Sequence, residues 1–173
     1  YYDHLAFEFW EHGITSVKSD IWALGMTLYR LLHGEEWYSE SGPPKMKIAD
    51  GGFRDSLKWL PHIPQRWRRT IRAMMHDDTN RRYQNVAQVQ LAFAGLPVEP
   101  DWECEVDGQQ VHWHRQQGGR IIRVEWNRYS PRRHDWRAWS EPVGAGRPRT
   151  FGGSNGQVGL RAAIRGLEGF FRP

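Results

Sequence analysis

The chain has 173 residues, a formal net charge of +4, a pI of about 9.5, ten tryptophans and one cysteine. This length accommodates one or two domains, and a single cysteine excludes an internal disulfide. Neither a secretory leader nor an apolar segment of membrane length is recognisable, so we expect a cytoplasmic protein with no membrane partner. The mild positive charge is compatible with an acidic partner but does not require one.

The most apolar part of the chain is residues 18–34, which carry the signals of a buried helix. Ser19 or Asp20 is predicted to cap its N-terminus, and Gly34 is predicted to end it. The apolar residues between them leave no continuous polar face: Ile21, Trp22, Ala23, Leu24, Met26, Leu28, Leu31 and Leu32. A helix that is apolar on nearly all sides is expected to be buried on nearly all sides. We therefore predict that it is the central helix of a helical domain.

Three further helices, and no strand, are predicted before residue 98. The first covers residues 43–50 and begins on proline. The second, over residues 64–75, is amphipathic, with apolar residues on one side and arginines facing away. These arginines are Arg66, Arg68, Arg69 and Arg72. Asn85 is predicted to cap a last helix, in which apolar residues recur at helical spacing.

Three motifs in this part resemble those of eukaryotic-type protein kinases, and among these the bacterial Ser/Thr kinases. Ala6-Phe7-Glu8 resembles the A-P-E motif, with Phe7 in place of the proline. Asp20-Ile-Trp22-Ala-Leu-Gly25 resembles the D-x-W-x-x-G helix, and Arg82 stands in a run similar to the arginine motif before the last helix. Each motif alone is weak, but their order matches the lower half of the kinase C-lobe over residues 1–96.

The resemblance implies structural roles for these residues. Glu8 would form a buried ion pair with Arg82, with Arg81 as the second choice. Asp20 would accept hydrogen bonds from backbone amides of the kinase catalytic loop. None of these roles is catalytic.

The parts of a kinase that hold ATP and Mg2+ are not recognisable in this sequence, because it has no Gly-rich loop, ATP-contacting lysine, H-R-D or D-F-G motif. We therefore expect no catalytic residue, no cofactor and no activity in this chain alone. The resemblance implies that ATP and Mg2+ serve a longer protein, whose partners are the missing N-terminal kinase region and a protein substrate. The alternative is a pseudokinase-like scaffold that presents the second part of the chain to a protein or a nucleic acid.

The second part of the chain begins after a linker at residues 97–100, which contains Pro97 and Pro100. From residue 99 onward there are twelve arginines, nine acidic residues and no lysine. Alternating patterns separated by Asp107-Gly108 and Gly118-Gly119 predict three antiparallel strands, at residues 102–106, 109–115 and 120–126. Residues 137–140 can add a short fourth strand, and a loop rich in Gly, Pro and Arg then leads to a closing helix.

The predicted fold class is therefore α+β. A helical kinase-like domain at residues 1–96 is followed by the linker at residues 97–100. A small antiparallel β-meander with a C-terminal helix, similar to no family that we recognise, occupies residues 101–173.

Two groups of side chains in the second part have a functional interpretation. Charge and stacking can bind nucleic acid or phosphorylated peptide at Arg132, Arg133, Trp136 and Trp139. We favour the alternative, in which the arginines lie in a solvated loop and the tryptophans pack into a small core. The other group consists of residue types that can bind zinc: Cys104, His112, His114 and His134. His112 and His114 form an H-x-H pair within it. Since no second cysteine accompanies it, we expect no metal site.

Overall fold

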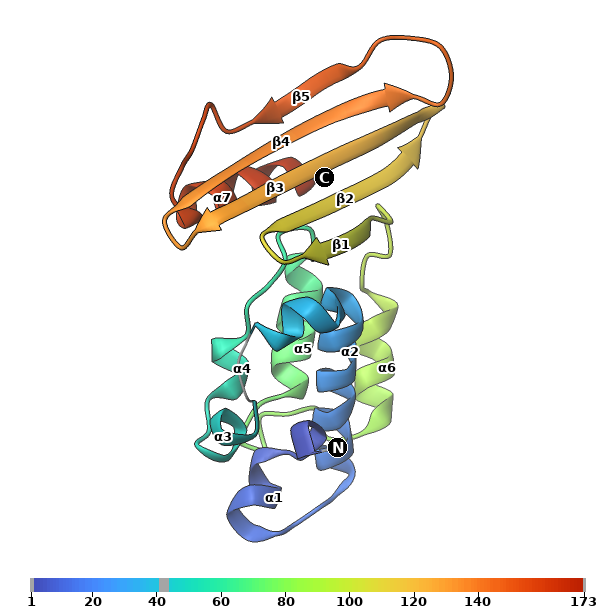
Figure 1. The fold of residues 1–173 in the computed structure, drawn as a ribbon. Coiled ribbons are helices and arrows are strands. Elements are labelled where there is room, and N and C mark those ends of the chain that lie inside the picture. The colour runs from blue at the N-terminus through green and yellow to red at the C-terminus, as the bar shows by residue number, and fades with distance from the viewer. Residues whose placement is uncertain (1, 41–43, 173) are drawn as a thin grey trace. The chain divides into compact units, whose positions relative to one another are not determined.

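The computed structural model describes residues 2–40 and 44–172, which form two compact units, residues 1–98 and 99–173 (Figure 1). The boundary between Val98 and Glu99 falls within the predicted linker. The fold is α+β, with helices in the first unit and a five-stranded antiparallel sheet and a helix in the second. Within the described ranges, no helix is long and apolar enough to cross a membrane.

Unit 1, residues 1–98, is helical. Its elements are the 3-10 helix η1 (Tyr2–His4) and the helices α1 (Phe7–His12), α2 (Val17–Ser39), α3 (Pro44–Ala49), α4 (Phe53–Ser56), α5 (Gln65–Met74) and α6 (Val86–Ala94). The described residues of this unit form no strand, as predicted. The Asn85 side chain caps α6 by accepting a hydrogen bond from the Gln88 amide, again as predicted. Pro43, the predicted first residue of α3, lies outside the described residues.

Helix α2 begins earlier than predicted because Ser16, rather than Ser19 or Asp20, caps it. The Ser16 hydroxyl accepts from the Lys18 amide at 3.2 Å, and the Ser19 hydroxyl accepts from the Ser16 amide at 3.1 Å. This is a capping box with serine at the position where glutamate is usual. Gly34 has a non-helical conformation (φ 77°, ψ 165°), so the first helical segment ends there as predicted, and a second segment continues after this kink to Ser39.

Helix α2 packs into the core of unit 1 through one of its sides. Trp22 and Met26 are almost fully buried and pack with Tyr29, Ile71 and Met75 in the main core. The prediction that the helix is buried on nearly all sides is wrong, because Leu24 is 40% exposed and Leu31 is 75% exposed. The apolar composition of α2 therefore exceeds what the described part of unit 1 covers.

Arg68 in α5 faces inward, contrary to the prediction from its amphipathic pattern. Its guanidinium donates hydrogen bonds to three backbone carbonyls of the loop 60–63, and its side chain is buried. The loop that precedes α5 supplies these acceptors, so the arginine satisfies them where a lysine could not form the same fork. Arg66 and Arg69 are exposed as predicted, and Arg72 is half-buried.

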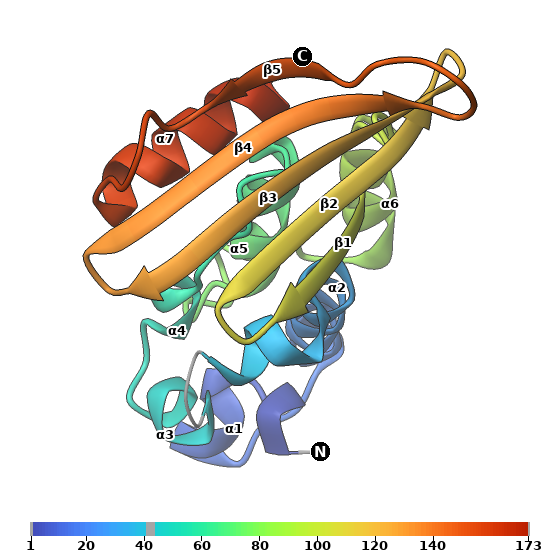
Figure 2. The same ribbon diagram turned by 45° about the horizontal axis from the view of Figure 1, so that its top comes forward.

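Unit 2, residues 99–173, is a five-stranded meander with a helix on one face (Figures 1 and 2). Its elements are β1 (Glu103–Asp107), β2 (Gln110–Gln117), β3 (Arg120–Ser130), β4 (Arg133–Pro142), β5 (Arg149–Gly153) and α7 (Leu160–Phe171). Each strand pairs antiparallel with the next one in the sequence. The fourth strand is longer than predicted, and β5 replaces part of the predicted loop.

The two faces of this sheet differ in chemistry. The helix-covered face contains the buried core, to which strands contribute Val111, Trp113, Val124, Trp126 and Ala138, and α7 contributes Ala163, Leu167 and Phe171. A Cβ at Gly166 would lie 2.7 Å from Nε1 of Trp136, so this indole packs directly against the bare backbone of α7. The open face is polar, because opposed residues such as Glu103, His114, Arg123 and Trp139 point to the same side.

Candidate functional site

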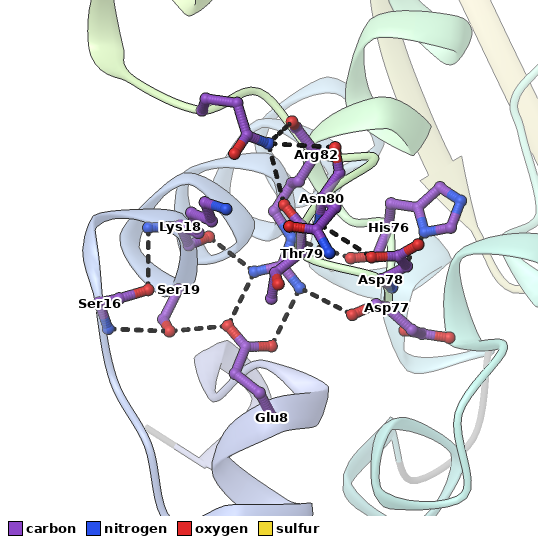
Figure 3. Close-up of polar contacts among 11 residues, drawn as sticks. Glu8, Ser16, Lys18, Ser19, His76, Asp77, Asp78, Thr79, Asn80 and Arg82 are labelled. Carbon is purple, nitrogen blue, oxygen red and sulfur yellow. Dashed lines mark hydrogen bonds and ion pairs between the residues drawn. The ribbon is translucent and has the colours of Figure 1, made fainter.

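The candidate site in unit 1 is a buried ion pair between Glu8 of α1 and Arg82 of the loop before α6 (Figure 3). Nη1 of Arg82 lies 2.8 Å from Oε1 of Glu8, and Nη2 lies 3.0 Å from Oε2. The pair is bidentate and joins residues 74 positions apart. The ion pair implied by the kinase resemblance is therefore present, and its partner is Arg82, whereas the side chain of Arg81 is exposed.

Arg82 connects three segments of the chain at this centre. Besides Glu8, its Nη1 donates to the Lys18 carbonyl at 2.7 Å and its Nε donates to the His76 carbonyl at 2.8 Å. The hydroxyl of Ser19 donates to Oε1 of Glu8 at 2.7 Å. The start of α2, helix α1 and the loop 76–85 are thus fixed to one guanidinium and one carboxylate.

The carboxylate of Glu8 is ionised in this environment. Burial opposes its ionisation, but the hydrogen bonds from Arg82 and Ser19 outweigh burial and hold the pKa of Glu8 below its usual value. Glu8 also lies in the first turn of α1, where the helix dipole favours a negative charge. Ala6, the N-cap residue of α1, is buried and adds an apolar contact without a side-chain cap.

A second hydrogen bond fixes the loop 76–85, and its sequence signal is weak. Oδ2 of Asp77 accepts a hydrogen bond from the Gly52 amide at 2.6 Å, which links this loop to the start of α4. Gly52 has a φ of +74°, a conformation that other residues rarely adopt. The Gly51-Gly52 pair before a short helix is the only local hint of this turn in the sequence.

The three residues of the helix motif occupy different environments. Trp22 is in the core, and Gly25 lies against α5, where a Cβ would come within 2.8 Å of Cγ of Met75. Asp20 is exposed, and its carboxylate forms no hydrogen bond or ion pair with another residue that the structure describes. Two of the three thus support packing, and the third presents an unused carboxylate at the surface.

The four accessory residues of unit 2 do not form one surface. Trp136 faces α7, with its ring centroid 6.2 Å from that of Phe170, whereas Trp139 is on the open face and donates to Glu141 at 2.9 Å. Arg132 and Arg133 lie at the turn between β3 and β4. Stacking on two adjacent tryptophans is therefore not available, because a separation of three residues along β4 places their side chains on opposite faces.

The residues that resemble zinc ligands are also divided between the two faces. His112 and His114 are on the open face, where His114 lies 3.2 Å from Glu103. Cys104 lies opposite Trp113 on the helix-covered side, and burial raises the pKa of its thiol to about 12. His134 is buried beside Trp126. The four side chains do not converge, and the described residues contain no group of three or more metal-ligating side chains.

Comparison of the chain with family models, with curated proteins and with solved structures found no match.

Proposed function

We propose that unit 1 is the lower part of the C-lobe of a bacterial-type Ser/Thr protein kinase, and that the chain is the C-terminal part of a longer protein. ATP-dependent protein phosphorylation is the proposed activity of that full-length protein, with Mg2+ as the metal. The proposal rests mainly on the buried bidentate pair between Glu8 and Arg82. The segments that contain Glu8 and Arg82 each resemble a kinase motif, and the ion pair between them is the one that the kinase resemblance implies.

The exposed side of α2 supports the same proposal. Leu24 and Leu31 leave apolar surface in water, although full burial of a leucine stabilises a protein by about 1.5–3 kcal/mol. Asp20 presents its free carboxylate on the same helix. In the proposed full-length protein, the catalytic loop and the helix before it cover this side, and backbone amides of the loop donate to Asp20.

The proposed role of unit 1 is to position groups that carry out the chemistry. The Glu8–Arg82 pair holds the end of the activation segment on the helical base, where a protein substrate docks. Helix α2 supports the catalytic loop through Asp20. Rigid positioning of this kind is needed for phosphoryl transfer, since catalysis there depends on placement and electrostatic stabilisation.

The sequence encoded upstream of Tyr1 tests the proposal. We expect a lysine in a third strand, an H-R-D catalytic loop and a D-F-G motif, in that order. If the upstream region encodes kinase-like strands and helices but lacks these residues, the enzyme is rejected in favour of a pseudokinase-like scaffold. An upstream region unrelated to kinases would reject both.

A further inference from the structure

The arginines of unit 2 fall into two groups that differ in their partners. One group is engaged within the unit: Arg115, Arg120, Arg123, Arg128 and Arg137. In this group Arg123 pairs with Glu141 at 3.1 Å and Arg137 pairs with Glu125 at 2.9 Å. The other group has no side-chain hydrogen bond, ion pair or ring contact with any described residue: Arg132, Arg133, Arg147, Arg149, Arg161, Arg165 and Arg172.

Three of the unengaged arginines are aligned on the solvent side of α7 and its C-cap. Arg161, Arg165 and Arg172 follow the spacing i, i+4 and i+11, which places them on one side of a helix. A rise of about 1.5 Å per residue separates the first two by about 6 Å along the axis. Glu168 is the only carboxylate in α7, and it lies on the same side.

The turn between β3 and β4 extends this basic side at the start of α7. The backbones of His134 and Val158 exchange hydrogen bonds of 2.9 and 2.7 Å, and Val158 directly precedes the N-cap residue Gly159. Figure 2 shows this turn beside the first turn of α7. Arg132 is therefore near the helix N-terminus, which has no side-chain cap, whereas Arg133 lies on the same face of β4 as Asp135 and points to the open face. We call four arginines the α7 surface: Arg132, Arg161, Arg165 and Arg172.

The positive charges of the α7 surface lower the stability of helix α7 in the isolated protein. Like charges at i and i+4, as in Arg161 and Arg165, destabilise a helix. Arg161 also lies in the first turn, where the helix dipole disfavours a positive charge and where α7 has no acidic residue. An anionic partner would reverse both effects, so binding explains an arrangement that stability does not.

Negative charge in the strands is directed to the other face of the sheet. Every acidic residue of the five strands has its side chain on the open face, as the pairing registers require: Glu103, Glu105, Asp107, Glu125, Asp135 and Glu141. The open face of the strands also carries Arg123, Arg133 and Arg137, so its charge is net negative, whereas α7 is net positive. This separation orients an anionic partner toward the helix.

We propose that the α7 surface binds the phosphate backbone of double-stranded nucleic acid without reading its sequence. The inference concerns unit 2 and does not depend on the proposed kinase activity. Base stacking is not its basis, because Trp136 packs under α7 and Trp139 pairs with Glu141. Phosphate contacts from arginine suffice for binding that is independent of sequence and sensitive to salt.

Two other anionic partners fit the surface less well. Insertion into a membrane needs an apolar helix face, but Ala163, Leu167 and Phe171 of α7 are buried against the sheet. A stable protein partner needs an apolar or aromatic anchor that becomes buried on binding. Leu160, at 40% exposure, is the only large apolar residue of α7 that is exposed and could serve as this anchor.

Fluorescence anisotropy of a short labelled DNA duplex, titrated with the 173-residue chain over a salt series, tests the proposal. The double variant Arg161→Gln/Arg165→Gln should weaken binding roughly 10–100-fold at about 0.1 M salt, and should lower the slope of log K against log salt by about 1.8. Arg161→Lys/Arg165→Lys should retain most of the affinity, because lysine keeps the charge. Thermal unfolding checks that each variant is folded.

The matched control is Arg69→Gln/Arg81→Gln, which removes the same charge from exposed positions of unit 1. It should change the affinity less than threefold. The proposal is overturned if the chain does not bind the duplex, or if the control weakens binding as much as the α7 variant. Binding of anionic vesicles or of an acidic peptide in preference to the duplex would also reject it.

Discussion

The buried pair between Glu8 and Arg82 gives the sharpest mutational prediction. Both side chains are almost fully inaccessible, with 10% of the Glu8 side chain and 0% of the Arg82 side chain exposed. Removal of either partner leaves the other charge buried without its counterion, which typically costs about 3–5 kcal/mol. Arg82→Ala should have the larger effect, because it also leaves the carbonyls of Lys18 and His76 without a donor.

A double-mutant cycle separates the pair from its surroundings. The variants are Glu8→Ala, Arg82→Ala and the combination of both, with Arg81→Ala as a surface control. Residues in direct contact couple by about 0.5–3 kcal/mol, and we expect a value of about 2–3 kcal/mol for this bidentate pair. Arg81→Ala should change stability by no more than about 0.5 kcal/mol, since its side chain is exposed.

Hydrogen-exchange mass spectrometry is a suitable assay, because it reports the local opening of each unit separately. Peptides from residues 6–12 and 76–85 should lose protection in both single variants, while peptides from β2 and β3 should be unchanged. A coupling energy within about 0.5 kcal/mol of zero, or equal effects of Arg81→Ala and Arg82→Ala, would refute this account of the site.

Three further predictions concern pH, packing and the boundary between the units. Burial lowers the pKa of His33 from 6.5 to about 4. The unfolded chain therefore binds more protons, and about 3 kcal/mol of stability present above pH 6.5 should be lost as the pH falls to about 4, as measured by urea midpoints, with a weaker dependence in His33→Gln. Gly166→Ala should destabilise unit 2 by about 1–3 kcal/mol because the new methyl group meets Trp136, whereas Gly169→Ala in the same helix has free space and should stabilise it by about 0.5–1 kcal/mol, both measured by thermal unfolding. Limited proteolysis should cut at residues 96–100 before it cuts within the strands. If the strands are cleaved first, the boundary is misplaced.

Local signals in the sequence predicted most of the helices and the first three strands. The last helix of unit 1 follows from Asn85 as its cap, and two of the hairpins follow from Asp107-Gly108 and Gly118-Gly119. Strand β5 could not be predicted, because its residues lack alternation and its strand character comes from pairing with β4. Tertiary pairing decided the structure there, where local propensity was weak.

The candidate site shows the same division between local and long-range information. The pairing of Glu8 with Arg82 was expected only from the kinase resemblance, since no local pattern connects residues so far apart. The inward position of Arg68 was missed because its acceptors are carbonyls of the preceding loop, which a helical pattern does not describe. The α7 surface was also missed, because its arginines come from two segments that only the fold brings together.

Transfer of radiolabelled phosphate from ATP tests the proposed kinase origin of unit 1 most directly. The longer protein, extended upstream of Tyr1, should phosphorylate a generic protein substrate in the presence of Mg2+, and the 173-residue chain should not. Asp20→Ala in the longer protein should reduce the transfer strongly, because the catalytic loop would lose its anchor on α2, while Arg81→Ala should have little effect. Transfer by the 173-residue chain itself, or full activity of the Asp20→Ala variant, would contradict the proposal.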